Sequence, residues 1–147
     1  MKSILVFLII CFLQLQVSAQ LSGTYTIGGS QPDFRYLSEA ASALVTQGVS
    51  GPVTMNIRNG VYWGFKLGYI KNASALYPVV FQAESGNRDS VIVRGKGFLE
   101  DDALIYMKFA NNINIRNITI DHIDGGTFAK GNSVQAVQCY SCKLDSC

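Results

Sequence analysis

The chain has 147 residues, of which 48% are hydrophobic and 15% charged, with 14 Gly, 3 Pro and 4 Cys. This composition excludes a disordered chain, which is less apolar, a collagen-like chain, which needs more Pro, and a disulfide scaffold, which needs more Cys. The formal net charge of +2 is too small and too evenly spread to favour nucleic acid or an anionic membrane surface as a partner.

The segment 1–19 has the order of a secretory signal peptide. Met1 and Lys2 give a positive start, residues 4–13 are uniformly apolar, and Val17-Ser18-Ala19 provides the small residues of a cleavage site. The apolar run is too short to cross a bilayer, and no second one follows. We therefore expect a protein without a membrane span that is secreted or attached to the cell surface.

Residues 20–50 are predicted to form a short strand and a helix. An alternating segment at residues 24–27 leads into the turn Gly28-Gly29. Between Phe34 and Val45, apolar residues recur every three or four positions, which is typical of one helix face, and Gly48 is placed to end the helix. The apolar face is narrow and rich in Ala, so we expect the helix to lie against an apolar surface.

Residues 51–147 contain a sequence repeat with a period of about 26 positions. The first alternating triplet, typical of a strand with one buried face, is Val53, Met55 and Ile57. It returns one period later as Val79, Phe81 and Ala83, and after one more period as Ile105, Met107 and Phe109. A second series with this spacing is Ile92, Ile118 and Leu144. Turn-forming pairs such as Asn59-Gly60 and Asn111-Asn112 separate the strands.

A repeat of this length has room for short strands but cannot bury its own apolar side chains, so it favours stacking on its neighbours. We therefore predict an all-β solenoid, a right-handed parallel β-helix of about four coils over residues 51–147. The helix at residues 34–47 would cap its first coil. The alternative is a β-sandwich whose strands share this spacing by coincidence, which the long register disfavours.

Several segments resemble the pectin lyase-like right-handed β-helix superfamily. They are Tyr25-Thr26-Ile27-Gly28-Gly29, Gly51-Pro52-Val53, Asn56-Ile57-Arg58-Asn59-Gly60-Val61-Tyr62, Phe81-Gln82-Ala83-Glu84-Ser85-Gly86 and Asn114-Ile115-Arg116-Asn117-Ile118-Thr119-Ile120. The closest likeness is to large secreted bacterial β-helix proteins that carry a type IX secretion sorting domain. No such domain is present, and the chain ends within an expected strand, so we expect it to be the N-terminal part of a longer protein.

The segment Ile120-Asp121-His122 is similar to a strand end near the active cleft of the pectate lyases in that superfamily. A lyase needs a base and a cation near the developing negative charge, for which Asp121, His122 and Arg116 are the catalytic candidates. Asp124, in the Gly-rich stretch that follows, is a further binding candidate. Because the chain has a single His and no matching second acid, we favour the alternative that these are solvated turn residues.

Glu100-Asp101-Asp102 is the only acidic run, and Asp101 and Asp102 are the candidate calcium ligands. The run lacks the alternating ligand spacing and the Gly of a calcium loop, so we favour a solvated turn and expect no cofactor. Cys139, Cys142 and Cys147 could bind a metal, pair with one another, or line the interior as small apolar groups. Their pairing stays open at this point.

Aromatic residues concentrate in and after the first expected coil, where Tyr62 and Trp63 are the candidate ligand-binding pair. Facing outward they would stack on sugar rings, and facing inward they would fill the interior. The leading functional hypothesis is a non-catalytic, extracellular β-helix that binds polysaccharide or a cell-surface glycan. The alternatives are a polysaccharide lyase or glycoside hydrolase whose catalytic coils lie beyond residue 147, and a structural adhesin stalk.

Overall fold

The computed structural model describes residues 19–95, 103–122 and 132–147. In this part of the chain the structure is dominated by parallel β-sheets and contains one α-helix. The first two elements are the strand β1 (Leu21–Ile27) and the helix α2 (Leu37–Gln47). The remaining strands are β2 (Val49–Ile57), β3 (Gly60–Tyr62), β4 (Phe65–Leu67), β5 (Val79–Ala83), β6 (Val91–Gly95), β7 (Ala103–Lys108), β8 (Ile113–Arg116), β9 (Thr119–His122), β10 (Asn132–Val137) and β11 (Lys143–Asp145).

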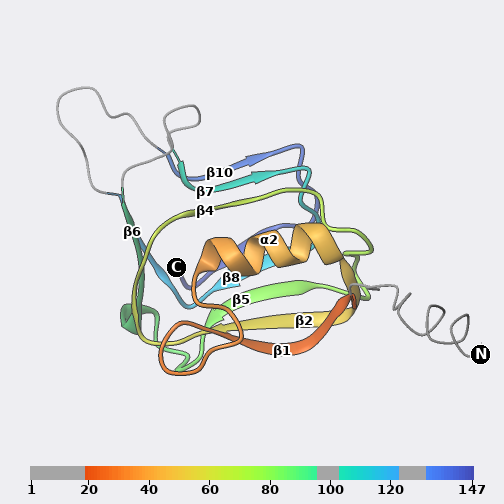
Figure 1. Cartoon of the computed structure of the whole chain (residues 1–147). Coiled ribbons are helices and arrows are strands. Elements are labelled where there is room, and N and C mark those ends of the chain that lie inside the picture. Colours follow the sequence, from red (N-terminus) through yellow and green to blue (C-terminus); the bar gives the residue numbers. More distant parts are fainter. Residues whose placement is uncertain (1–18, 96–102, 123–131) are drawn as a thin grey trace, which may run out of the picture.

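The strands form three parallel sheets that the chain visits in rotation. Sheet A has the order β1-β2-β5-β8-β11, sheet B the order β3-β6-β9, and sheet C the order β4-β7-β10. Each circuit of the chain therefore adds one strand to each sheet: β2, β3 and β4 in the first, β5, β6 and β7 in the second, and β8, β9 and β10 in the third (Figure 1).

The first step of the predicted register is confirmed. Met55 pairs with Phe81, and on either side of it Val53 pairs with Val79 and Ile57 with Ala83. All six side chains are buried, as the alternating pattern requires. Parallel pairing therefore places like positions of successive circuits over one another, and their side chains form a continuous core.

The third predicted triplet is wrong in its register and in its last member, although Ile105 and Met107 are buried in β7 as expected. Phe81 stacks on Ile115 of β8 in sheet A, whereas Met107 lies beside Leu67 of β4 in sheet C. Phe109, expected inside, is 47% exposed and has a φ of 59°, so it turns the chain between β7 and β8. The reason is that the second circuit is longer than the first, so the predicted period does not reach the next strand of sheet A. Alternation fixes which side chains face inward but not which strand lies next to which.

The second predicted series is also wrong. Ile92 pairs with Thr119, and Leu144 pairs with Ile115. Ile118 is buried but lies between β8 and β9. The members of this series therefore belong to different sheets or to a turn.

The predicted helix is confirmed, with a later start at Leu37 and the expected end before Gly48. Phe34 instead makes an isolated bridge to Ile27. Leu37, Ala40, Ala41 and Leu44 are buried, and the helix packs against β4 and β1, at the edge strands of sheets C and A. It covers the near end of the three-sheet arrangement in Figure 1. The helix therefore buries its apolar face at this end of the stack.

Replacing the two phenylalanines separately tests this corrected register. Phe81→Ala removes a fully buried ring that packs against Phe65 with 5.2 Å between centroids. We expect it to lower the free energy of unfolding by about 3–5 kcal/mol in guanidinium denaturation. Phe109→Ala, at an exposed position, should change it by no more than about 0.5 kcal/mol. Equal losses in the two variants would contradict the register.

Candidate functional site

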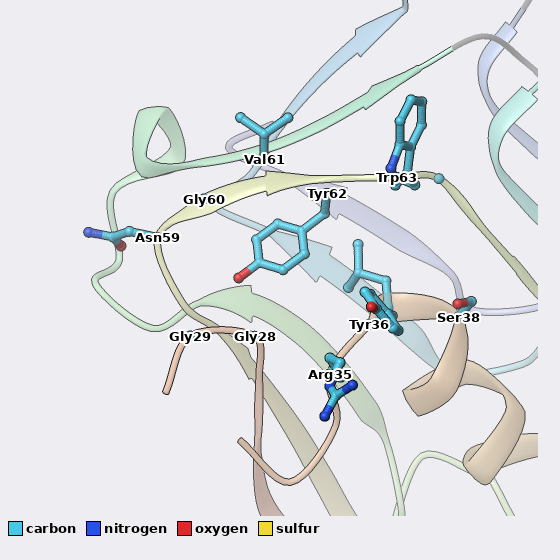
Figure 2. Close-up of a pocket in the computed structure, with 12 residues that line it drawn as sticks. Gly28, Gly29, Arg35, Tyr36, Ser38, Asn59, Gly60, Val61, Tyr62 and Trp63 are labelled. Carbon is cyan, nitrogen blue, oxygen red and sulfur yellow. The ribbon is translucent and has the colours of Figure 1, made fainter. Parts of the chain in front are cut away.

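A groove of about 570 Å³ lies between β3, the Gly28-Gly29 turn and the start of α2. Figure 2 shows that its walls come from segments far apart in the sequence. The lining residues are Gly28, Gly29, Arg35, Tyr36, Leu37, Ser38, Asn59, Gly60, Val61, Tyr62, Trp63 and Gly64. The predicted pair Tyr62 and Trp63 therefore lies at one groove.

The glycine turn allows β1 and β3 to approach each other. Gly28 and Gly29 have φ values of 73° and 74°, a backbone conformation that other residues rarely adopt. A Cβ on Gly28 would overlap the hydroxyl of Tyr62, and a Cβ on Gly29 would come within 2.7 Å of the Arg58 side chain. These two positions therefore need glycine both for the turn and for the space beside it.

Tyr62 is held as a wall of the groove. Its hydroxyl donates to the carbonyl oxygens of Arg58 at 2.7 Å and of Ile27 at 3.3 Å. Burial raises the pKa of Tyr62, with the charge of Arg58 opposing and that of Glu84 adding to the shift. The hydroxyl is therefore a neutral donor used inside the protein, and the ring fixes the shape of the groove.

Trp63 is the exposed aromatic surface of the site. Its side chain is 77% exposed and lines both the groove and a second hollow of about 180 Å³ that includes Val61 and Arg94. One edge of the indole lies close to Gly95, where an added Cβ would come within 3.1 Å of the ring. The ring is thus supported at one edge while most of its surface stays open.

The opposite side of the groove carries polar and aromatic groups. Arg35 and Tyr36 project from the segment that leads into α2, beside Ser38 (Figure 2). Tyr36 is exposed, and Arg35 makes no ion pair with any residue in the described parts of the chain. The groove thus offers hydrogen-bond donors from Arg35 and Ser38, while the indole of Trp63 points away from them at its edge (Figure 2).

Asp33 and Thr26 hold the loop that carries these groups. The backbone N–H and the hydroxyl of Thr26 donate to the Asp33 carboxylate at 2.7 and 2.8 Å. These two hydrogen bonds lower the pKa of Asp33 below its ordinary value, the backbone one most. The next anchor is Glu39, whose carboxylate accepts from the backbone N–H of Arg35 at 2.7 Å. Both ends of the loop are therefore tied to regular structure.

The lowered pKa of Asp33 predicts a pH-dependent contribution to stability. A carboxyl with a depressed folded pKa stabilises the fold above its unfolded value, about 3.9, and loses this contribution as the pH falls through the folded value. We expect Asp33→Asn to lower the melting temperature at pH 7 and the difference from the natural chain to shrink toward pH 3. A difference that is the same at both pH values would contradict this role.

The catalytic candidates have separate partners in the structure. Asp121 lies on β9 in sheet B, where its carboxylate accepts from Arg94 Nε at 2.7 Å and also pairs with Arg94 Nη2. Arg116 lies on β8 in sheet A and donates to Gln82, which donates to Asn56, each at 2.8 Å. These contacts belong to ladders between neighbouring strands.

Other predicted site residues fall at or beyond the limits of the described chain. His122 is the last residue of β9, and its backbone pairs with Gly95. Asp101, Asp102 and Asp124 lie outside the described residues, as does nearly all of the expected signal peptide. Within the described ranges, no three His, Cys, Asp or Glu side chains gather as metal ligands would.

Reasoning from the sequence missed Gly28, Arg35 and Tyr36 as parts of the site. The one signal in the sequence is the glycine pair ahead of the helix, which predicts a turn. The link to Tyr62 depends on the pairing of β1 with β2, which brings Ile27 beside Ile57.

Comparisons with known proteins give no further assignment, because no family model, curated protein or solved structure matches the chain. A separate result concerns membranes: the helix in the described part of the chain is not long and apolar enough to span a bilayer.

Proposed function

We propose that the groove beside Trp63 binds a polysaccharide chain and that this segment of the protein is non-catalytic. The observation that carries the proposal is an indole that is 77% exposed and has one edge close to Gly95. An aromatic ring fixed in this way presents a flat apolar face to a sugar ring at little entropic cost. Arg35, Ser38 and Asn59 line the same groove and supply hydrogen-bonding groups for hydroxyls.

The proposal includes the finer description of the fold. We infer that the three circuits are coils of a right-handed parallel β-helix of the pectin lyase-like kind, with α2 as its N-terminal cap. The rotation through three parallel sheets and the packing of α2 on β1 and β4 support this inference. The signal-like segment 1–19 supports export to the cell surface or the medium.

The hydrogen-bonding pattern favours binding over catalysis at the predicted candidates. Arg94 pairs with Asp121, and Gln82 accepts from Arg116. Each polar group is thus used in a contact between circuits. Of these four residues, only Arg94 lies near Trp63, where it lines the smaller hollow.

The groove can be tested by affinity electrophoresis in gels that contain neutral or acidic polysaccharides. Aromatic stacking contributes about 0.5–1.5 kcal/mol, so Trp63→Ala should weaken binding by up to about tenfold. Tyr69→Ala is the matched control, because Tyr69 is 59% exposed but does not line the groove. We expect its retardation to equal that of the natural chain.

Fluorescence provides an independent measurement, since Trp63 is the single Trp of the sequence. A bound polysaccharide should shift the emission to shorter wavelength, because it removes the indole from water. Absence of both retardation and an emission change with every polysaccharide tested would refute the proposal. Equal weakening in the Trp63 and Tyr69 variants would place the binding site elsewhere.

A further inference from the structure

The corner between β10 and β11 repeats the corner between β7 and β8. Gln138, Ser141 and Ser146 have φ values of 51°, 55° and 52°, and one circuit earlier Phe109, Asn112 and Asn117 have φ values of 59°, 56° and 55°. Strand pairing has the same offset, since Tyr140 bridges to Asn111, and Leu144 pairs with Ile115. The last described corner is therefore stacked residue for residue on the one before it.

This register assigns the cysteines to interior positions. Cys139 takes the place of Ala110 and Cys142 that of Ile113, and both of these earlier residues are fully buried. Consistent with this placement, the Cys142 thiol donates to the carbonyl oxygen of Ala110 at 3.3 Å. Both cysteines pack against the hydrophobic core, and each is only partly exposed.

Each thiol at this corner lies near backbone carbonyl oxygens, and the Cys139 thiol donates to that of Val137 at 3.4 Å. Burial is the main cause of a raised pKa at Cys142; the backbone of Ile113 opposes the shift, while the thiol of Cys139 adds to it through its charge and a hydrogen bond. Cys147 follows β11, and the same register places it over Ile118 of the preceding circuit. Its thiol donates to the carbonyl oxygens of Ile115 and Asp145. Cys139 and Cys142 therefore share the core side of one corner, whereas Cys147 is exposed beyond β11.

We propose that Cys139 and Cys142 form an intramolecular disulfide on the inner side of this corner, and that Cys147 remains a free thiol. The bond would join two residues that flank the positive-φ residue Ser141 and would fix the direction in which the chain leaves sheet C and enters the edge strand β11 of sheet A. Oxidation fits the exported location that the segment 1–19 predicts, because disulfides persist outside the cytosol.

The reaction is a thiol–disulfide exchange with a small disulfide as the oxidant. One cysteine thiolate attacks a sulfur of oxidised glutathione and releases one glutathione thiol, which leaves a mixed disulfide on the protein. The second cysteine thiolate then attacks the protein sulfur of that mixed disulfide and releases the second glutathione. Two protein thiols are oxidised to one disulfide, and one glutathione disulfide is reduced to two thiols.

A metal site is the weaker interpretation of the same cysteines. A structural zinc site needs four ligands, usually Cys and His. Two cysteines lie on the core side of this corner, and no group of three His, Cys, Asp or Glu forms among the residues the structure describes. A disulfide needs only the pair that is present.

Peptide mapping tests the proposal directly. The full chain is equilibrated with oxidised glutathione, alkylated without reduction, digested with trypsin and analysed by mass spectrometry. Cleavage after Lys130 and Lys143 gives a peptide, residues 131–143, that holds Cys139 and Cys142 and excludes Cys147. We expect this peptide to be unlabelled and lighter than its reduced form by the mass of two hydrogen atoms. The peptide with Cys147 should carry either the alkyl label or one glutathione, as a thiol without a protein partner would.

Two variants complete the test. Cys147→Ser should leave the mass of the 131–143 peptide unchanged, whereas Cys142→Ser should expose Cys139 to alkylation or to a mixed disulfide with glutathione. In the natural chain, labels on both Cys139 and Cys142, a stable glutathione adduct on either, or a bond from either to Cys147 would overturn the proposal. The natural chain and Cys147→Ser decide the question even if Cys142→Ser does not fold.

Discussion

The structure depends on the burial of inward side chains between successive circuits of the chain. A single circuit of three short strands has no core of its own, so its apolar residues are buried only when the next circuit lies on top. The column Met55, Phe81 and Ile115 in sheet A shows this stacking, and Phe65 joins it from sheet C through its contact with Phe81. The burial of these side chains therefore depends on the parallel pairing of the strands, as the backbone hydrogen bonds do.

The same stacking determines the outer surface. Because side chains alternate along each strand, the residues between the buried ones face outward and also lie over one another. Asn56, Gln82 and Arg116 form a hydrogen-bonded ladder across three strands of sheet A in this way, and Arg94 and Asp121 form a shorter one in sheet B. Polar residues that resemble a catalytic group in the sequence therefore have structural partners.

The groove lined by Tyr62 and Trp63 lies where the regular stacking begins. At this end α2 occupies the place beside β4, and the loop before it folds over β3. The loop is anchored by Thr26, Asp33 and Glu39, and the Tyr62 ring is fixed by its hydroxyl. A groove built in this way is formed before a ligand arrives, which reduces the entropic cost of binding. The cysteine corner lies at the other end of the stack, among the last strands of the described chain.

The sequence by itself determined the strands at Val53–Ile57 and Val79–Ala83, the Ala-rich helix, the turn positions, and Tyr62 and Trp63 as a candidate binding pair. These features are local, since they depend on alternation, helical spacing and the residues that favour turns. Only the tertiary structure decided that Met107 lies beside Leu67 and not beside Phe81, because circuits of unequal length change the pairing without changing the alternation. It also decided that Arg35 and Tyr36 line the same groove as Trp63, since this arrangement arises from the pairing of β1 with β2 and from the packing of α2 on β4.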